Sequence, residues 1–336
     1  MAKAFPPGKL PIDVLAELLA RHPRRDPRVI LGPKPGEDAA VLNIGADRYL
    51  VAKTDPITFA TDEIGWYAVH VNANDIATTG ATPAWFMATL LLPPERATRA
   101  LVEAIFKQIY SACDVLGVSL VGGHTEITPG IDRPIISGTM FGLAEGSRLI
   151  TTGGAQVDDV LLVTKGVPIE ATAIMAREKR DVLEGQFPAE FLERCAGYLH
   201  DPGISVVRDA SVALHAGRVH AMHDPTEGGL ATGLWEMADA AALRLLVNPS
   251  LAVLEEGRVL CEALGLDPLG AIASGAMLLA VHSDDAGRIA AALQDAGIPV
   301  FRIGSAEQGP ADVVVVQGEP RRLPRPERDE IARLFE

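Results

Sequence analysis

The chain of 336 residues carries 30 lysines and arginines against 44 aspartates and glutamates, which gives a formal net charge of −14. A surface this acidic repels phosphodiester backbones and excludes a protein that binds nucleic acid irrespective of base sequence. The hydrophobic share of 48% is typical of folded globular proteins, and the 3 cysteines, which lie far apart, exclude a disulfide framework and favour the reducing cytoplasm.

Insertion into a membrane is not expected. The most apolar stretch, residues 84–92, is followed by two prolines and is far shorter than the roughly 20 residues of a membrane-spanning helix. The first residues contain several prolines and lack the apolar region of a signal peptide. We therefore expect a soluble, cytoplasmic protein.

Strands and helices alternate in the first domain, which we expect to span residues 1–150. Two segments carry hydrophobic residues at three- and four-residue steps, the pattern of a helix with one buried side. Shorter apolar runs bounded by glycine or proline predict strands. The predicted helices are 65–79 and 94–116, and the predicted strands are 39–44, 49–53, 84–92, 118–121 and 135–142.

A break near residue 150 separates this domain from a second one, 151–320. Residues 145–156 are rich in glycine and threonine and show little periodicity, which is typical of a domain boundary. Both halves mix strands and helices, so the fold class is α/β or α+β, and residues 321–336 are predicted to form a surface tail. Helices are predicted at 169–179, 189–198, 205–216, 228–242 and 284–296, and strands at 159–164, 218–222, 276–281, 300–303 and 312–316.

Three aspartates stand at the boundaries of predicted elements in the first domain. Asp38 precedes the first strand, Asp55 follows the second, and Asp75 lies beside Asn74 in the first helix. Carboxylate and amide oxygens suit Mg²⁺, which binds through a few carboxylates together with substrate phosphates. The alternative is that these residues only form turns and a polar helix face. The chain has no G-x-x-x-x-G-K-[ST] motif, so ATP would not be bound by a P-loop.

A second motif, GGHTE at 122–126, follows a predicted strand. The paired glycines Gly122 and Gly123 permit a close approach of a ligand to the backbone. His124 and Glu126 are candidates for acid–base catalysis, and Glu126 for a further metal contact. The alternative is a glycine loop with a surface histidine.

A third motif, DPTEGG at 224–229, precedes a predicted helix. Asp224 or Thr226 is placed to cap that helix, and the free N–H groups near Gly228 and Gly229 suit a phosphate. Plain helix capping is the alternative, and residue types alone do not separate the two.

Eight motifs in order resemble those of the PurM-like superfamily, which includes aminoimidazole ribonucleotide (AIR) synthetase, selenophosphate synthetase, thiamine-monophosphate kinase and HypE. The resemblance is greatest to HypE-like, AIR-synthase-related proteins and covers nearly the whole chain. Each motif alone is common, whereas their order is specific. They are GKLP (8–11), GEDAAVL (36–42), TDPIT (54–58), VNANDIATTGA (71–81), GGHTE (122–126), TTGGA (151–155), DPTEGGLA (224–231) and SGAML (274–278).

The resemblance implies a two-domain PurM-like fold, with an N-terminal domain that forms a β-barrel with its twin in a homodimer and a C-terminal α/β domain. ATP and Mg²⁺ would lie in a cleft between the two domains. The residues carried over for Mg²⁺ and phosphate are Asp38, Asp55 and Asp75, with Asn74 beside them. Gly122 and Gly123 would face the nucleotide, and Lys9, near the start of the chain, would close over the phosphates.

Three departures from the family pattern separate this chain from HypE. HypE ends in a cysteine that carries a carbamoyl group, whereas the last cysteine here is Cys261. The family's DPTRGG reads DPTEGG, which replaces a cation by Glu227. His124 stands where relatives have an acidic residue in GGDT or GGET. These departures indicate a different acceptor.

Three functions remain in view. The first is a Mg²⁺- and ATP-dependent enzyme that phosphorylates a small molecule or activates its amide-like oxygen. The second is a non-catalytic nucleotide-binding partner or regulator in a HypE-like maturation complex. The third is true HypE activity with Cys195 or Cys261 as the carrier, which is disfavoured because both cysteines fall in predicted helices.

Overall fold

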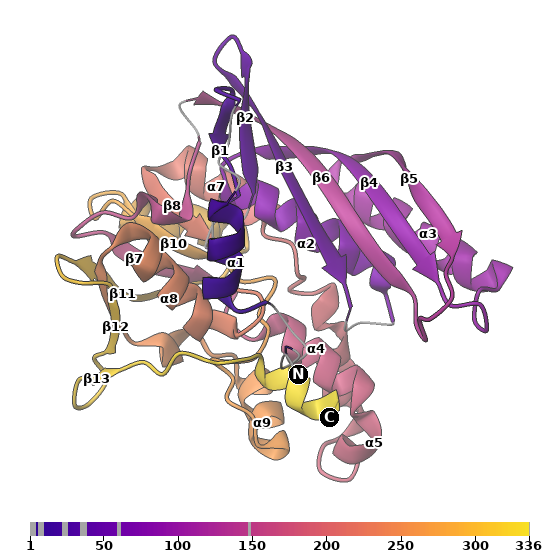
Figure 1. The fold of residues 1–336 in the computed structure, drawn as a ribbon. Coiled ribbons are helices and arrows are strands. Elements are labelled where there is room, and N and C mark those ends of the chain that lie inside the picture. Colours follow the sequence, from indigo (N-terminus) through magenta and orange to yellow (C-terminus); the bar gives the residue numbers. More distant parts are fainter. Residues whose placement is uncertain are drawn as a thin grey trace.

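The computed structural model describes residues 5, 10–21, 26–33, 39–58, 62–146 and 149–335. They form two α/β domains, each built around one mixed sheet (Figure 1). In the first domain the sheet has six strands in the order β1-β2-β3-β6-β4-β5. Its elements are α1 (Ile12–Ala20), β1 (Val29–Leu31), β2 (Ala40–Gly45), β3 (Arg48–Ile57), α2 (Ile64–Thr78), β4 (Thr82–Leu92), α3 (Arg99–Leu116), β5 (Ser119–Ile127) and β6 (Ile135–Glu145).

The second domain holds seven strands in the order β13-β12-β9-β11-β7-β10-β8. Its strands are β7 (Val160–Thr164), β8 (Val219–His223), β9 (Arg244–Val247), β10 (Leu278–Val281), β11 (Val300–Glu307), β12 (Asp312–Val315) and β13 (Arg321–Arg322). Its helices are η2 (Thr152–Gly154), α4 (Ile169–Glu178), α5 (Arg180–Leu183), α6 (Ala189–Ala196), η3 (Gly197–Leu199), α7 (Val207–Ala216), α8 (Gly229–Ala241), η4 (Pro249–Ala252), α9 (Glu255–Leu264), α10 (Ala286–Asp295) and η5 (Glu330–Phe335).

The first sheet is open, not closed into a barrel: in the described part of the chain, β1 and β5 are its two edges. Helices α2 and α3 lie on one face of it (Figure 1). The other face, which we call the outer face, carries partly exposed apolar side chains such as Trp85 and Met87, each 39% exposed. The barrel expected from the resemblance is therefore not made by one chain, and the outer face is the surface on which a second chain would have to pack.

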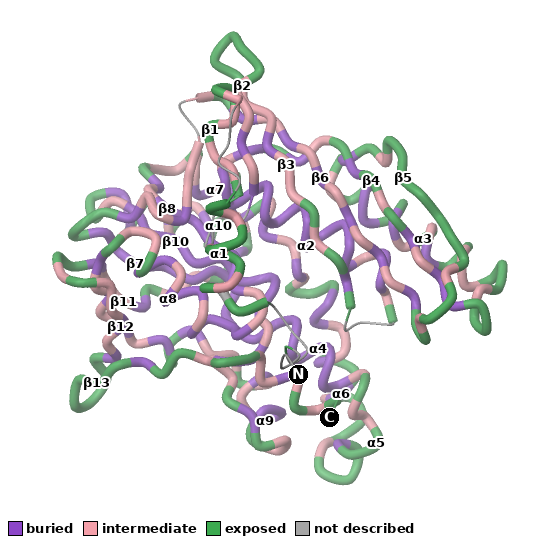
Figure 2. The backbone as a smooth tube through the Cα atoms, viewed as in Figure 1, coloured by how far each residue is buried: buried purple, intermediate pink, exposed green. Residues whose placement is uncertain are grey.

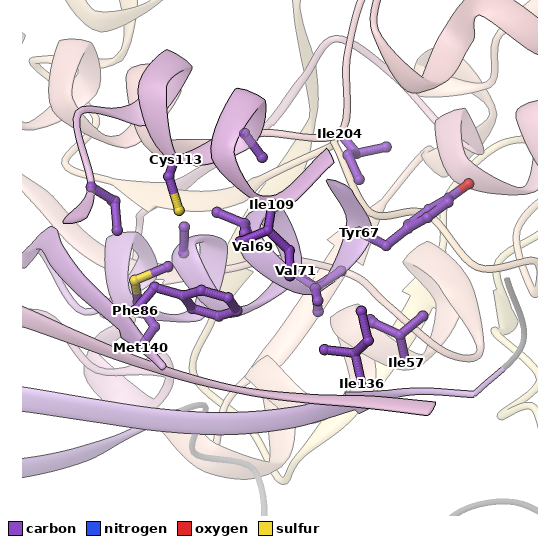
Figure 3. Packing of buried hydrophobic residues seen from close by; sticks show 14 of the residues in the cluster. Ile57, Tyr67, Val69, Val71, Phe86, Ile109, Cys113, Ile136, Met140 and Ile204 are labelled. Carbon is purple, nitrogen blue, oxygen red and sulfur yellow. The ribbon is translucent and has the colours of Figure 1, made fainter. Parts of the chain in front are cut away.

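Helix α2 is buried along nearly its whole length because it lies between the first sheet and the second domain. Its apolar residues belong to a cluster that continues from the first domain into residues 169–204. Ile204 of the second domain is drawn in this cluster with Val69 and Val71 of α2 (Figure 3). The shared core fixes the polar side chains of α2 relative to both domains.

Several elements differ from the sequence-based expectation: α1, β1, β9 and α9 were not predicted, and β3 continues to Ile57 and so includes Asp55. Helix α3 begins at Arg99 rather than near residue 94, because the Thr98 side chain accepts a hydrogen bond from the Leu101 N–H and caps the helix there. Strand β5 continues through Ile127, so the GGHTE segment is part of an edge strand paired with β4 and not a loop. Among the described helices, none combines the length and apolar character needed to cross a membrane.

Candidate functional site

Two of the three aspartates predicted to bind metal meet at the junction of β3 and α2. Lys53 Nζ lies 3.1 Å from Asp75 Oδ2 and 3.7 Å from Asp55 Oδ2. The Asp75 side chain is 5% exposed, whereas that of Asp55 is 39% exposed. Lys53 precedes Asp55 by two residues in β3, which places both on the same face of the strand. This cluster, Lys53–Asp55–Asp75, has a formal charge of −1 and opens to solvent at Asp55.

The backbone of Asp55 is held in place by Asn72 of α2. The Asn72 amide nitrogen donates to the Asp55 carbonyl at 3.3 Å and to the Ala68 carbonyl at 2.8 Å. Gly138 of β6 leaves room for this amide, because a Cβ at that position would overlap the Asn72 side chain. Asn72 is thus a positioning residue for the end of β3.

Asn74, expected beside the nucleotide, has another set of partners. Its amide nitrogen donates to the Ile204 carbonyl at 2.7 Å, and its amide oxygen accepts from the Val206 N–H at 2.9 Å. Both ends of this buried amide therefore join α2 to the second domain. The Asn74 side chain is thus used at the domain junction and not at the Lys53–Asp55–Asp75 cluster.

Two further expected residues, Asp38 and Lys9, lie outside the described residues. Their assignment to Mg²⁺ and phosphate stays a prediction from the sequence.

The expected catalytic pair, His124 and Glu126, is formed on strand β5. The His124 Nε2 and Glu126 Oε2 atoms are 3.3 Å apart, and the two side chains are 66% and 52% exposed. Strand register pairs His124 with Thr89 and Glu126 with Leu91 of β4. Since side chains alternate along a strand, this register places the pair on the outer face of the sheet.

The structure does not bring this pair to the Lys53–Asp55–Asp75 cluster. Asp55 of β3 pairs with Gly138 of the neighbouring strand β6. Gly138 pairs with Ala88 of β4, and Ala88 pairs with Gly123 of β5. Three strand spacings correspond to about 14 Å across the sheet. Asp55 and Asp75 lie on the helix-covered side, so within one chain the sheet itself separates them from His124.

The glycines of the same motif, Gly122 and Gly123, line an apolar cavity. This cavity of about 300 Å³ lies between β4, β5 and α3 and is also lined by Phe106 and Ile109. Gly123 has a φ of 151°, and a Cβ there would overlap the Ala88 carbonyl of β4. The close approach of β4 is thus sufficient to require glycine at position 123.

The backbone N–H groups at the start of helix α8 are hydrogen-bonded within the protein. The Gly228 N–H donates to Asp329 Oδ2 at 2.6 Å, and the Gly229 N–H donates to the Thr226 carbonyl at 2.9 Å. Asp224, directly after β8, is buried. The expected phosphate position at this helix start is therefore filled by a carboxylate from residues 321–336, the segment expected to be a surface tail.

A pocket between the two domains begins at Asp55 and continues to the second domain. The side chains on its far side include Glu170, Glu227 and Ser274. Burial raises the pKa of Glu170 to about 7, although a hydrogen bond from Ser274 acts to lower it. Burial also raises the pKa of Asp329 to about 6. The surroundings do little to stabilise the negative charge of these two carboxylates, which is typical of functional sites.

Three participants were missed by reasoning from the sequence. Lys53 had a usable signal, because residues two apart in a strand share a face and Asp55 was already a candidate. Glu170 and Asp329 had none, because only the packing of the domains buries them beside Glu227. Together the cluster and the pocket offer hard oxygen donors, one lysine and a neighbouring acceptor space.

Comparison with known proteins matches both domains. Residues 36–144 match the model of the AIR synthase related protein, N-terminal domain, and residues 156–317 match the C-terminal domain of the same family. Carbamoyl dehydratase HypE of Cupriavidus necator is 30% identical over 286 residues, which are 80% of this chain and 75% of that protein. The putative hydrogenase expression/formation protein MJ0676 of Methanocaldococcus jannaschii is 27% identical over 266 residues, 77% of this chain and 75% of that protein. The solved structure of hydrogenase maturation protein HypE in complex with ATP superimposes with a TM-score of 0.70 at 26% identity and covers 88% of this chain and 90% of that one.

Proposed function

The chain belongs to the AIR synthase-related protein family, and from this we propose that it is an ATP-dependent enzyme that phosphorylates a small-molecule acceptor or activates its oxygen. The observation that carries the proposal is the Lys53–Asp55–Asp75 cluster beside the pocket between the domains. A similar protein, HypE, has been solved with ATP bound.

The donor set of the cluster fits Mg²⁺. This ion takes oxygen ligands and is commonly held by one or two carboxylates together with substrate phosphates. Asp55 and Asp75 would hold it, and Asp38 is the third expected ligand. When bound, Mg²⁺ supplies positive charge that offsets the acidic surroundings and the charge of the phosphates. Lys53 would contribute a further positive charge, and Asn72 keeps the end of β3 in position for binding.

The experiment that tests the proposal is a calorimetric titration with a non-hydrolysable ATP analogue, with and without Mg²⁺. We expect binding to require Mg²⁺ and to weaken at least about tenfold in Asp75→Asn, because a charged ligand oxygen is lost. Asp114→Asn, an exposed aspartate on α3, is the matched control and should bind as the wild type does. Failure of the wild type to bind the analogue under either condition would overturn the proposal.

A second candidate is a nucleotide-binding regulator of a maturation complex. The observation that favours it is the state of the thiols: Cys113, Cys195 and Cys261 are all buried, and burial raises their pKa values to about 11, 11 and 12. Thiolate is the reactive form of cysteine, so none of these residues suits a carbamoyl carrier. Mass spectrometry after incubation with carbamoyl phosphate should show no adduct on any of the three cysteines. An ATPase rate that no acceptor increases would favour the regulator over the enzyme.

A further inference from the structure

Carboxylates from both domains converge on the pocket between them. Its carboxylate lining consists of Asp55 from β3, Glu170 from the first turn of α4 and Glu227 from the segment before α8. The pocket has a volume of about 80 Å³. This is room for a small organic group, since a single water needs roughly 10–15 Å³ on this measure.

Glu170 is the most informative of these residues. Its side chain is about 5% exposed, and its Oε2 atom has no hydrogen-bond partner among the described residues. A buried carboxylate oxygen without a partner is unfavourable, because water has been removed and nothing replaces it. The negative charges of Asp329 and Glu227 add to this disadvantage. Glu170 therefore lines the pocket, and one oxygen of its carboxylate is buried without a hydrogen-bond partner among the described residues.

Asp329 lies behind Glu227 and increases the negative field. Its carboxylate accepts from the Gly228 and Ile331 N–H groups. Glu227 and Ile272 line both this pocket and a smaller cavity that reaches Asp329. Acidic side chains thus lie at intervals from Asp55 to the C-terminal segment. Glu227 stands where the family resemblance leads one to expect an arginine.

The remaining walls of the pocket are partly apolar and partly polar. The apolar side chains are Pro56, Ile57, Val71 and Ile272, and the hydroxyl-bearing side chains are Thr58, Thr226 and Ser274. A hydrated metal ion keeps several waters and suits a polar cage, whereas an organic cation combines N–H donors with apolar surface. The lining therefore matches an organic cation.

We propose that this pocket binds the cationic end of the acceptor, an ammonium, amidinium or guanidinium group whose N–H donors reach the carboxylates of Glu170 and Glu227. The inference rests on the proposed function, because it places the acceptor on the far side of Asp55 from the Lys53–Asp55–Asp75 cluster. It deepens that function by naming the acceptor class: a small molecule with a positively charged nitrogen group.

The test compares acetamidinium with acetamide, which have the same size and shape but differ in charge. Dissociation constants are measured by ligand-observed NMR on the full chain. We expect acetamidinium to bind at least about tenfold more tightly than acetamide, and Glu170→Gln and Glu227→Gln each to weaken it about fivefold or more. Glu190→Gln, at an exposed position on α6, is the control and should leave binding unchanged.

Equal binding of acetamide and acetamidinium would overturn the inference, as would acetamidinium binding that neither pocket variant weakens. If millimolar MgCl₂ displaces acetamidinium from the wild type but not from Glu170→Gln, the pocket would be assigned to a metal instead. Glu227 is only partly buried, so its variant keeps the test valid if Glu170→Gln fails to fold. Titration of the ATP analogue with the same samples separates the two proposals: nucleotide binding without cation binding removes this inference alone.

Discussion

Glu170 shows how a single buried carboxyl couples stability to pH. Burial raises its pKa from 4.5 to about 7 in the folded chain. Between these values the folded state keeps a proton that the unfolded chain releases, so the free energy of unfolding falls as the pH rises from about 4.5 to 7. At 1.36 kcal/mol per pKa unit, the raised pKa of Glu170 lowers the free energy of unfolding by about 3 kcal/mol across this pH range. Asp329, with a pKa raised to about 6, acts in the same direction at lower pH.

We expect Glu170→Gln to remove the part of this dependence between about pH 6 and 7, because glutamine does not titrate, whereas Asp329 still titrates at lower pH. Urea unfolding at several values between pH 4.5 and 8 measures the slope for the wild type and the variant. Glu190→Gln should retain the wild-type slope. Identical slopes in the wild type and Glu170→Gln would show that the carboxyl is not held in its neutral form by burial.

At the scale of elements, strands β4 and β5 approach so closely that only glycine fits at position 123. We expect Gly123→Ala to reduce the free energy of unfolding by about 2–3 kcal/mol, because the added Cβ would overlap the Ala88 carbonyl and the φ of 151° disfavours any side chain. Gly122→Ala is the matched neighbour: there the nearest atom, Met87 Cε, would be 3.6 Å away.

Chemical denaturation measures the free energy of unfolding of Gly122→Ala and Gly123→Ala. A small change in Gly122→Ala beside a large one in Gly123→Ala assigns the second glycine to strand packing. A stable Gly123→Ala protein that no longer binds the ATP analogue would instead assign this glycine to the nucleotide. The comparison is informative because the two positions are adjacent on the same exposed edge strand.

At the scale of the whole molecule, we propose that two copies pair through the outer face of the first sheet. Exposed apolar side chains there include Trp85 and Met87 on β4. The neighbouring edge strand β5 is exposed along most of its length (Figure 2). Contiguous exposed apolar surface is typical of an interface. Pairing would also enclose the His124–Glu126 pair, which within one chain stands apart from the Lys53–Asp55–Asp75 cluster.

Sedimentation velocity tests this pairing. We expect the wild type to sediment at twice the chain mass and Trp85→Glu at the chain mass, because a buried unpaired carboxylate strongly disfavours the contact. Tyr110→Glu introduces the same charge at an exposed aromatic on α3, which covers the opposite side of the sheet, and should remain dimeric. A wild type that stays monomeric at micromolar concentration would contradict the proposal.

The sequence alone was sufficient for the family and the α/β class, and it singled out Asp55 and Asp75, which the structure places around Lys53. These conclusions depend on local information: the order of short motifs, hydrophobic periodicity and oxygen donors at the ends of elements. The barrel was expected only from the pairing of two copies, and in the described residues of a single chain the first sheet is open.

Only the tertiary structure decided which side of the sheet Asp55 and His124 occupy. His124 and Asp55 lie on opposite faces because strand register, set by contacts between distant segments, determines where a side chain points. Likewise, Asn74 is used at the domain junction and Asp329 caps α8, because segments more than a hundred residues apart meet there. Pairings of this kind depend on the packing of the whole chain, and no local pattern of residue types records them.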